Sequence, residues 1–135
     1  MSTDIVPLRQ MTVTQMRLAK GDFSDHMRAG NPVALTSRGR QVAVALPYPQ
    51  WKDLASRVPV DTGDTERITA SRIFQRLTDV IAKARSSGIH TIVTMHARDY
   101  TRLKGDREVT THRTGELWVL CPVDWWRQAV VTRVH

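Results

Sequence analysis

Apolar residues recur at helical spacing in two separate stretches of the chain. Intervals of three and four residues place such residues on one face of a helix. The apolar positions are Met16, Ala19, Phe23 and Met27 in the first stretch and Ile73, Leu77, Val80, Ile81 and Ala84 in the second. Thr14 and Ser71 lie near the starts of these stretches and are expected to cap the helices through their hydroxyls. Gly30 and Gly88 follow them and suit the left-handed position at which a helix ends.

Two pairs of short apolar runs follow the predicted helices and predict four strands. They cover residues 32–35, 42–46, 89–93 and 117–121. Arg38-Gly39-Arg40 separates the first two runs and predicts a hairpin turn. Pro47 and Pro122 each end the second run of a pair, because proline has no N–H to donate to a sheet. A short helix bearing tryptophan is expected after each proline.

The order of predicted elements is the same in both parts of the chain, which indicates an internal repeat. Residues 37–52 align with residues 112–127 without a gap, at an offset of 75. The upstream segments, residues 13–30 and 69–88, each read as a short strand, a helix and a glycine, and they align at an offset near 57. The difference (75 minus 57) predicts an insertion of about 18 residues in the second part, roughly residues 97–111.

We therefore predict a tandem duplication of one small α+β unit. The first copy covers residues 1–57, and the second covers residues 67–135 and contains the insertion. Residues 58–66 form a linker, which contains Pro59, Gly63 and several acidic residues.

The chain is basic, with 20 Lys and Arg against 13 Asp and Glu and a formal net charge of +7. The charge is spread evenly: residues 1–60 carry 8 basic and 4 acidic residues, and residues 61–135 carry 12 and 9. A basic balance of this size favours a polyanionic partner such as nucleic acid. Since neither end is a basic tail, the fold itself has to build any surface that binds an anion.

The sequence also bears on the expected compartment. Cys121 is the single cysteine, so a disulfide framework is excluded and a reducing cytoplasm is the expected setting. Residues 1–4 have no basic or apolar region of the kind that a signal peptide requires. No apolar run approaches the roughly 20 residues of a membrane span, so we expect no membrane partner.

Several segments of the first copy together form a pattern of strand, helix start, glycine and hairpin. They are Thr12-Val13-Thr14-Gln15-Met16-Arg17, Gly21-Asp22-Phe23, Met27-Arg28-Ala29-Gly30 and residues 33–47. Over residues 10–55 this pattern resembles the DNA-binding N-terminal domain of the Phd/YefM antitoxin family. Residues 67–131 resemble the same domain, interrupted by the insertion.

The resemblance implies both a function and an arrangement of the two copies. Members of this family are homodimers whose shared sheet and paired first helices grip DNA, and they repress their own promoter. A single unit of about 50 residues buries too little surface to be stable alone. We therefore expect an α+β fold in which the two copies form an intramolecular pseudo-dimer with a shared antiparallel sheet, present as a monomer or as a homodimer of it.

The chain also departs from the family pattern. Arg17 takes the place of the family's helix-start arginine, which reaches DNA, and Arg38 lies next to the place of the hairpin arginine. The family's glutamate is Gln15 here, and Phe74 stands in the second copy where Arg17 stands in the first. The sequence ends at His135, soon after the second closing helix, so we expect no toxin-binding tail of the family's kind.

Basic residues are the candidate DNA contacts, because arginine binds guanine bidentately in the major groove and binds phosphates from turns. The candidates are Arg17, Lys20, Arg38, Arg40, Arg72, Arg76, Arg98, Arg102, Lys104 and Arg107. The last four belong to the insertion, with a turn expected at Lys104-Gly105-Asp106. Either an arm along the DNA backbone or a plain loop or hairpin is compatible with this composition.

Other chemistry finds little support in the sequence. The histidines and Cys121 lack the spacing of a zinc site, and no nucleotide-binding or nucleophile motif is present, so we expect no metal, no cofactor and no enzyme. Cys121 is expected to be a buried hydrophobe. Trp51 and the Trp125-Trp126 pair are expected in the core, although adjacent tryptophans cannot both face it, which leaves one to cover the linker or a partner.

These features predict a cytoplasmic, sequence-specific binder of double-stranded DNA, a transcriptional repressor of antitoxin-like type related to toxin–antitoxin systems. The alternative is a protein-binding module that has lost DNA binding and holds a toxin or regulator through its insertion or Trp-bearing end. Salt dependence separates the two, since binding to DNA phosphates releases counterions.

Overall fold

The chain folds into short strands and helices. The computed structural model describes residues 8–95, 98–104, 107–113 and 115–133. In chain order the elements are β1 (Arg9–Thr12), α1 (Val13–Leu18), α2 (Lys20–Arg28), β2 (Val33–Ser37), β3 (Arg40–Pro47), α3 (Tyr48–Arg57), the 3-10 helix η1 (Thr62–Asp64), β4 (Thr65–Thr69), α4 (Ala70–Ile73), α5 (Leu77–Ser87), β5 (His90–Thr94), β6 (Arg98–Lys104), β7 (Arg107–Arg113), β8 (Glu116–Cys121) and α6 (Val123–Arg133).

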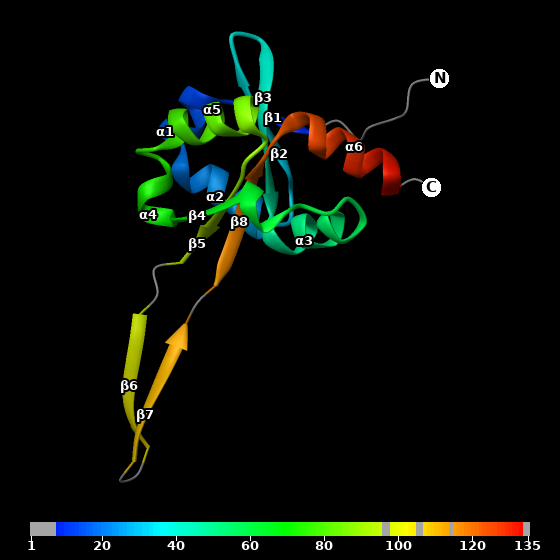
Figure 1. Cartoon of the computed structure of the whole chain (residues 1–135). Coiled ribbons are helices and arrows are strands. Elements are labelled where there is room, and N and C mark those ends of the chain that lie inside the picture. The colour runs from blue at the N-terminus through cyan, green and yellow to red at the C-terminus, as the bar shows by residue number, and fades with distance from the viewer. Residues whose placement is uncertain (1–7, 96–97, 105–106, 114, 134–135) are drawn as a thin grey trace.

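The main sheet has β3 and β8 at its centre. Within the described residues it contains six strands in the order β1-β2-β3-β8-β5-β4 (Figure 1). The outer pairs β1–β2 and β4–β5 are parallel, and the three inner pairs are antiparallel. The α+β fold is therefore confirmed. The expectation of an antiparallel sheet is wrong for the outer pairs, because a helical crossover returns the chain in its original direction.

Helices cover both faces of this sheet. On one face the sheet packs against α1, α2, α4 and α5, which bury Met16, Phe23, Ile73 and Leu77 completely. On the opposite face it packs against α3 and α6, which bury Trp51 and Trp126. The apolar positions predicted for the upstream helices are all buried except Ala19, which is half-buried. Alternating residues of β3 and β8 enter the two cores, so both central strands are buried on both faces.

Each upstream helix is broken into two pieces, where the spacing alone predicts one. Ala19 lies outside the helical region at φ −115° and ψ 53°, and it separates α1 from α2. Arg76, at φ −108° and ψ 11°, immediately precedes α5, so the second helix is broken between α4 and α5. The apolar face continues across both breaks because each short piece packs on the same core.

The predicted helix caps are wrong by a few residues. The side chain of Thr12 accepts a hydrogen bond from the N–H of Gln15 at 3.0 Å, and Gln15 accepts one from the N–H of Thr12 at 2.9 Å. This capping box satisfies N–H groups at the start of α1, so Thr14 lies inside the helix. In the second half Thr69 occupies the N-cap position of α4, and Ser71 lies inside that helix.

The turns occur at the residues that the sequence predicts. Gly30 and Gly88 have φ angles of 80° and 67°, the left-handed conformation predicted for the ends of the helices. Arg38 and Gly39 connect β2 to β3 with φ angles of 53° and 76°. Two successive positive φ values are the signature of a tight hairpin turn that matches the twist of its strands, as predicted.

The two irregular regions of the prediction contain regular structure. The expected linker, residues 58–66, contains η1, and β4 begins inside it at Thr65. The insertion forms a hairpin, in which β6 and β7 pair from Arg98 opposite Arg113 to Lys104 opposite Arg107. Of the expected turn, residues 105 and 106 lie outside the described residues, as does residue 97 at the start of the insertion.

In the described part of the chain, no helix has the length and apolar character needed to cross a membrane.

Two tryptophans enclose a buried histidine on the α3–α6 face. The Nε1–H of Trp51 donates to Nδ1 of His90 at 3.0 Å, and the ring of Trp125 meets that of His90 edge-on with centroids 4.6 Å apart. Trp125 also donates to the carbonyl of Val58 at 3.2 Å and so covers the start of the expected linker. Burial lowers the pKa of His90 from 6.5 to about 4, which leaves the ring neutral at pH 7.

We predict that His90 makes the stability of the fold depend on pH. The unfolded chain protonates this ring near pH 6.5, but the folded protein does so only near pH 4. The stabilisation is therefore complete above pH 6.5 and is lost progressively down to pH 4, by about 2 kcal/mol between pH 7.5 and 5.0. Urea unfolding of the protein and of His90→Asn, which keeps an acceptor for Trp51, measures this difference. Parallel pH profiles for the two proteins would contradict it.

Candidate nucleic-acid interface

Four of the predicted contact residues lie on one side of the molecule, over α1, α2, α4 and α5. We call this surface, residues 13–28 and 70–87, the helical face. The four residues are Arg17, Lys20, Arg72 and Arg76, and all are exposed. They lie between the apolar positions that bury the helices on the sheet, so amphipathic spacing directs their side chains toward solvent. The helical face combines residues from both halves of the chain.

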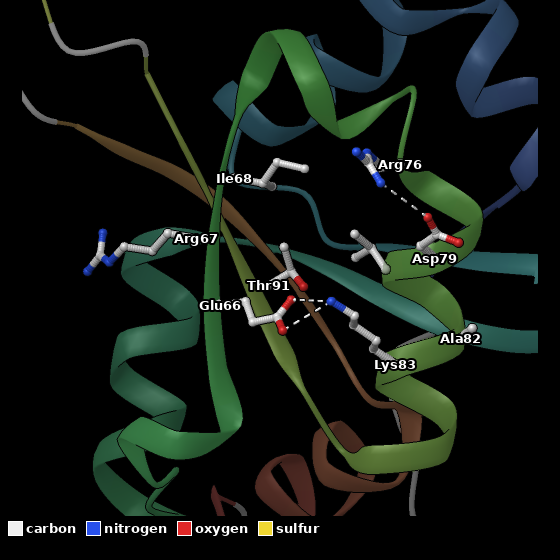
Figure 2. A pocket seen from close by; sticks show the side chains of 9 residues that line it. Glu66, Arg67, Ile68, Arg76, Asp79, Ala82, Lys83 and Thr91 are labelled. Carbon is white, nitrogen blue, oxygen red and sulfur yellow. Dashed lines mark hydrogen bonds and ion pairs between the residues drawn. The ribbon is translucent and has the colours of Figure 1, made fainter.

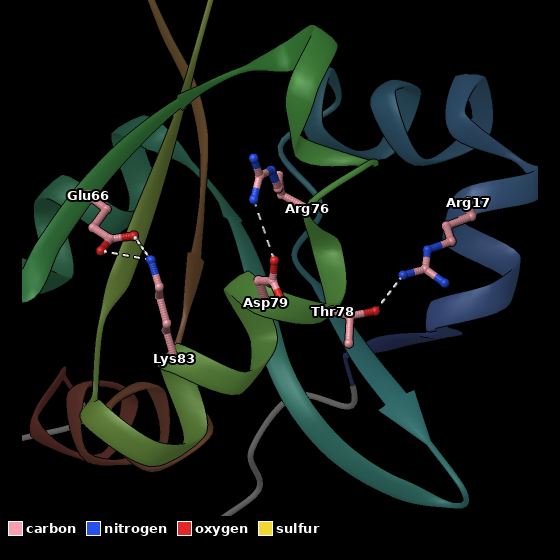
Figure 3. Close-up of polar contacts among 6 residues, drawn as sticks. All are labelled: Arg17, Glu66, Arg76, Thr78, Asp79 and Lys83. Atoms are coloured by element: carbon pink, nitrogen blue, oxygen red, sulfur yellow. Dashed lines mark hydrogen bonds and ion pairs between the residues drawn. The ribbon is translucent and has the colours of Figure 1, made fainter.

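Arg17 lies where the two halves of the helical face meet. Its Nη2 donates to the hydroxyl of Thr78 at 2.6 Å, and this contact joins α1 to α5 (Figure 3). The side chain remains exposed, and a guanidinium has five donors, so one hydrogen bond leaves donors for a ligand. The contact orients Arg17 before any ligand binds.

A second contact across the same boundary joins Lys20 to Phe74. The Lys20 ammonium lies 5.1 Å from the centroid of the Phe74 ring, within the range of a cation–π interaction. Phe74 is half-buried and meets the ring of Phe23 edge-on at 6.4 Å. Phe74 therefore packs between α2 and the end of α4, and it supplies no positive charge.

Beside α5 the charges of the helical face are balanced. Arg76 lies 3.7 Å from Asp79, and Lys83 lies 3.1 Å from Glu66 on the edge strand β4. Figure 2 shows both pairs at the rim of a hollow of about 430 Å³ between β4 and α5. On the same edge strand Arg67 donates to Glu116 at 3.0 Å, and this hydrogen bond lowers the pKa of the Glu116 carboxyl. Of the cations of the helical face, Arg17, Lys20, Arg72 and Arg85 have no carboxylate partner within the described residues.

The other predicted residues lie at opposite ends of the sheet. Arg38 and Arg40 are exposed at the turn before β3. Arg98, Arg102, Lys104 and Arg107 belong to the hairpin before β8. Because β3 and β8 are antiparallel, the connections that precede them lie at opposite ends, as Figure 1 shows. The ten residues therefore form three separate groups: the helical face, the β2–β3 turn and the β6–β7 hairpin.

Two residues of this surface, Thr78 and Leu18, were not predicted from the sequence. Thr78, the partner of Arg17, carries no motif and lies 61 residues away, so nothing local indicates the contact. Leu18 follows Arg17 and is 83% exposed, the largest value among the exposed large apolar residues described. Its position outside the apolar helix spacing is the signal that could have marked it.

The single cysteine belongs to the core on the α3–α6 face. Cys121 is fully buried, burial raises the pKa of its thiol, and the thiol donates to the carbonyl of Val44 at 3.2 Å. A buried, protonated thiol is a poor nucleophile and a poor metal ligand. Among the described residues, no group of three or more His, Cys, Asp or Glu side chains could hold a metal ion.

Comparison with known proteins does not identify the chain. No family model matches it, and neither a curated protein nor a solved structure shows significant similarity to it.

Proposed function

We propose that the chain binds double-stranded DNA sequence-specifically through its helical face and acts as a transcriptional repressor of the Phd/YefM antitoxin type. In this proposal the chain is a tandem duplication, and its halves form a pseudo-dimer. The observation that carries the proposal is the symmetric order of the sheet about the β3–β8 pair. The helical face is then the intramolecular equivalent of the paired first helices of that family.

The register of the central ladder supports the duplication. Ala45 and Leu120, which match at the sequence offset of 75, lie directly opposite each other in the sheet. A two-fold axis perpendicular to the sheet, between two antiparallel strands, requires one residue to pair with the equivalent residue of the other copy. The same rotation exchanges the flanking pairs, which are Val44 with Cys121 and Leu46 with Val119.

Details away from the centre support it as well. The hydroxyl of Thr36 reaches the carbonyl of Met11 at 3.5 Å, and that of Thr94 reaches the carbonyl of Ile68 at 3.5 Å. The β2–β3 ladder has a register shift immediately before Thr36, and the β5–β8 ladder has one immediately before Thr94. These irregularities are not needed for a sheet of this order, so their recurrence favours a common origin of the halves.

DNA as the ligand is supported by charge and by shape. The chain carries a net charge of +7, and four exposed cations of the helical face, Arg17, Lys20, Arg72 and Arg85, have no carboxylate partner among the described residues. Helices that present arginine at their exposed ends can reach base edges in the major groove. The contacts of Arg17 with Thr78 and of Lys20 with Phe74 hold the two halves of this surface in one arrangement.

A protein-binding module remains the second candidate, and the ion pairs beside α5 favour it. They neutralise Arg76 and Lys83, and Phe74 contributes no charge, so only Arg72 and Arg85 of the second half remain for DNA on the helical face. The Trp-bearing end is a poor site for this partner, since Trp51 and Trp126 are buried and Trp125 bonds within the chain. A partner would bind at the hollow between β4 and α5, and its affinity would depend weakly on salt.

We predict that Arg17→Ala weakens binding to the preferred DNA by about 1–3 kcal/mol, because a bidentate base contact is lost. Fluorescence anisotropy with a duplex selected from a random library measures this change. Selectivity over random duplex is expected to fall together with affinity.

Two matched variants control this experiment. Arg57→Ala removes the same charge from α3, on the opposite face of the sheet, and is expected to leave affinity nearly unchanged. Thr78→Val removes the hydrogen bond that orients Arg17 but keeps the arginine, and is expected to lose clearly less affinity than Arg17→Ala. If Thr78→Val lost as much affinity as Arg17→Ala, or if Arg17→Ala lost none, direct contact of Arg17 with DNA would be excluded.

We also predict that the two halves unfold together. Leu120 is fully buried at the centre of the sheet, so Leu120→Ala is expected to destabilise the whole chain by about 2–5 kcal/mol. Tryptophan fluorescence and far-ultraviolet circular dichroism should follow one coincident urea transition. Val131→Ala, at a 38% exposed position, should change stability little. Two separate transitions would show that the halves fold independently and would contradict the pseudo-dimer.

A further inference from the structure

The register of β6 and β7 places most of the cations of this hairpin on one of its two faces. Opposite residues of an antiparallel pair lie on the same face, and successive residues alternate between faces. One face therefore holds Arg98 with Arg113, Tyr100 with Thr111, Arg102 with Val109, and Lys104 with Arg107. We call this the cationic face of the ribbon. It holds five positive charges and no acidic residue.

The other face holds the acidic residues of the two strands. It consists of Asp99 opposite His112, Thr101 opposite Thr110, and Leu103 opposite Glu108. Its formal charge is −2 with histidine neutral, against +5 on the cationic face, counted over β6 and β7 alone. In such a short ribbon this division produces a one-sided positive field, which attracts a polyanion to a single face.

The ribbon extends away from the six-stranded sheet and from the helices (Figure 1). Each strand has seven residues, which corresponds to a length of about 23 Å at 3.3–3.4 Å per residue. An isolated two-stranded ribbon is only marginally stable in water. A surface that binds the cationic face would therefore stabilise the ribbon as well.

We propose that the cationic face of the ribbon binds the phosphates bordering the major groove of duplex DNA. This proposal rests on the proposed function for its ligand, and it adds a second contact region at a distance from the helical face. The major groove of B-form DNA is about 12 Å wide and admits a two-stranded ribbon. The corresponding groove of duplex RNA is too narrow for one, so the ribbon favours DNA over RNA.

The sharpest test compares two substitutions in neighbouring residues of β6. Arg102→Gln removes one positive charge from the cationic face, and Thr101→Glu makes the same change in net charge on the other face. Affinity for a selected DNA duplex is measured by anisotropy between 50 and 200 mM salt. We expect Arg102→Gln to lower the slope of log affinity against log salt by about one, and Thr101→Glu to leave it unchanged.

A triple variant enlarges the effect. Arg98→Gln, Arg102→Gln and Arg107→Gln together should lower the slope by nearly three, so that the fourfold rise in salt costs this variant roughly 40-fold less affinity than it costs the unsubstituted protein. Urea unfolding followed by tryptophan fluorescence should not change, since the described tryptophans lie in α3, β8 and α6. A matching duplex RNA serves as the comparison ligand and should bind more weakly.

The results separate failure of this proposal from failure of the proposed function. If Arg17→Ala weakens binding and the ribbon variants do not, the ribbon proposal is overturned and the helical face stands. If the ribbon variants weaken binding and Arg17→Ala does not, the ribbon proposal stands and the helical face is overturned. Equal effects of Arg102→Gln and Thr101→Glu, tighter binding to duplex RNA, or no DNA binding by the unsubstituted protein would each overturn the ribbon proposal.

Discussion

Pairing of β3 with β8 is the contact on which the rest of the structure depends. Without it both strands would be edge strands, with unpaired N–H and C=O groups and apolar faces exposed to water. Four ladder pairs, from Val44 with Cys121 to Pro47 with Trp118, join the two halves into one sheet. Both cores lie across this ladder, since Ala45 and Leu120 enter one and Leu46 and Val119 enter the other. Each half therefore depends on the other for its burial.

The same ladder sets the geometry of the proposed DNA-binding surface. Joining the halves at β3 and β8 brings α1 next to α5, where Arg17 meets Thr78. It also directs the β2–β3 turn and the β6–β7 ribbon to opposite ends of the sheet. In the proposed account DNA is contacted by a central helical face and, farther along the duplex, by the ribbon. The two turn arginines would be the counterpart of the ribbon at the other end.

Local rules predicted the features that depend on local burial and backbone angles. The helix spacing identified buried residues such as Phe23 and Val80, and glycine identified the turns at Gly39 and Gly88. The helix breaks and the parallel outer pairs were not predictable in this way, since packing between distant segments decides them. The contact surface was predicted least well. Exposed arginines look alike in sequence, whereas ion pairs such as Arg76 with Asp79 distinguish them in the fold.

The most direct test of the central claim, that the helical face binds duplex DNA, is an NMR titration of the ¹⁵N-labelled chain with a duplex selected from a random library. The account predicts that amide shifts change in α1, α2, α4 and α5, with Arg17 and its neighbours among the largest changes, while α3 and the buried part of α6 stay unperturbed. Changes confined to α3 and α6, or no changes at 50 mM salt, would contradict it.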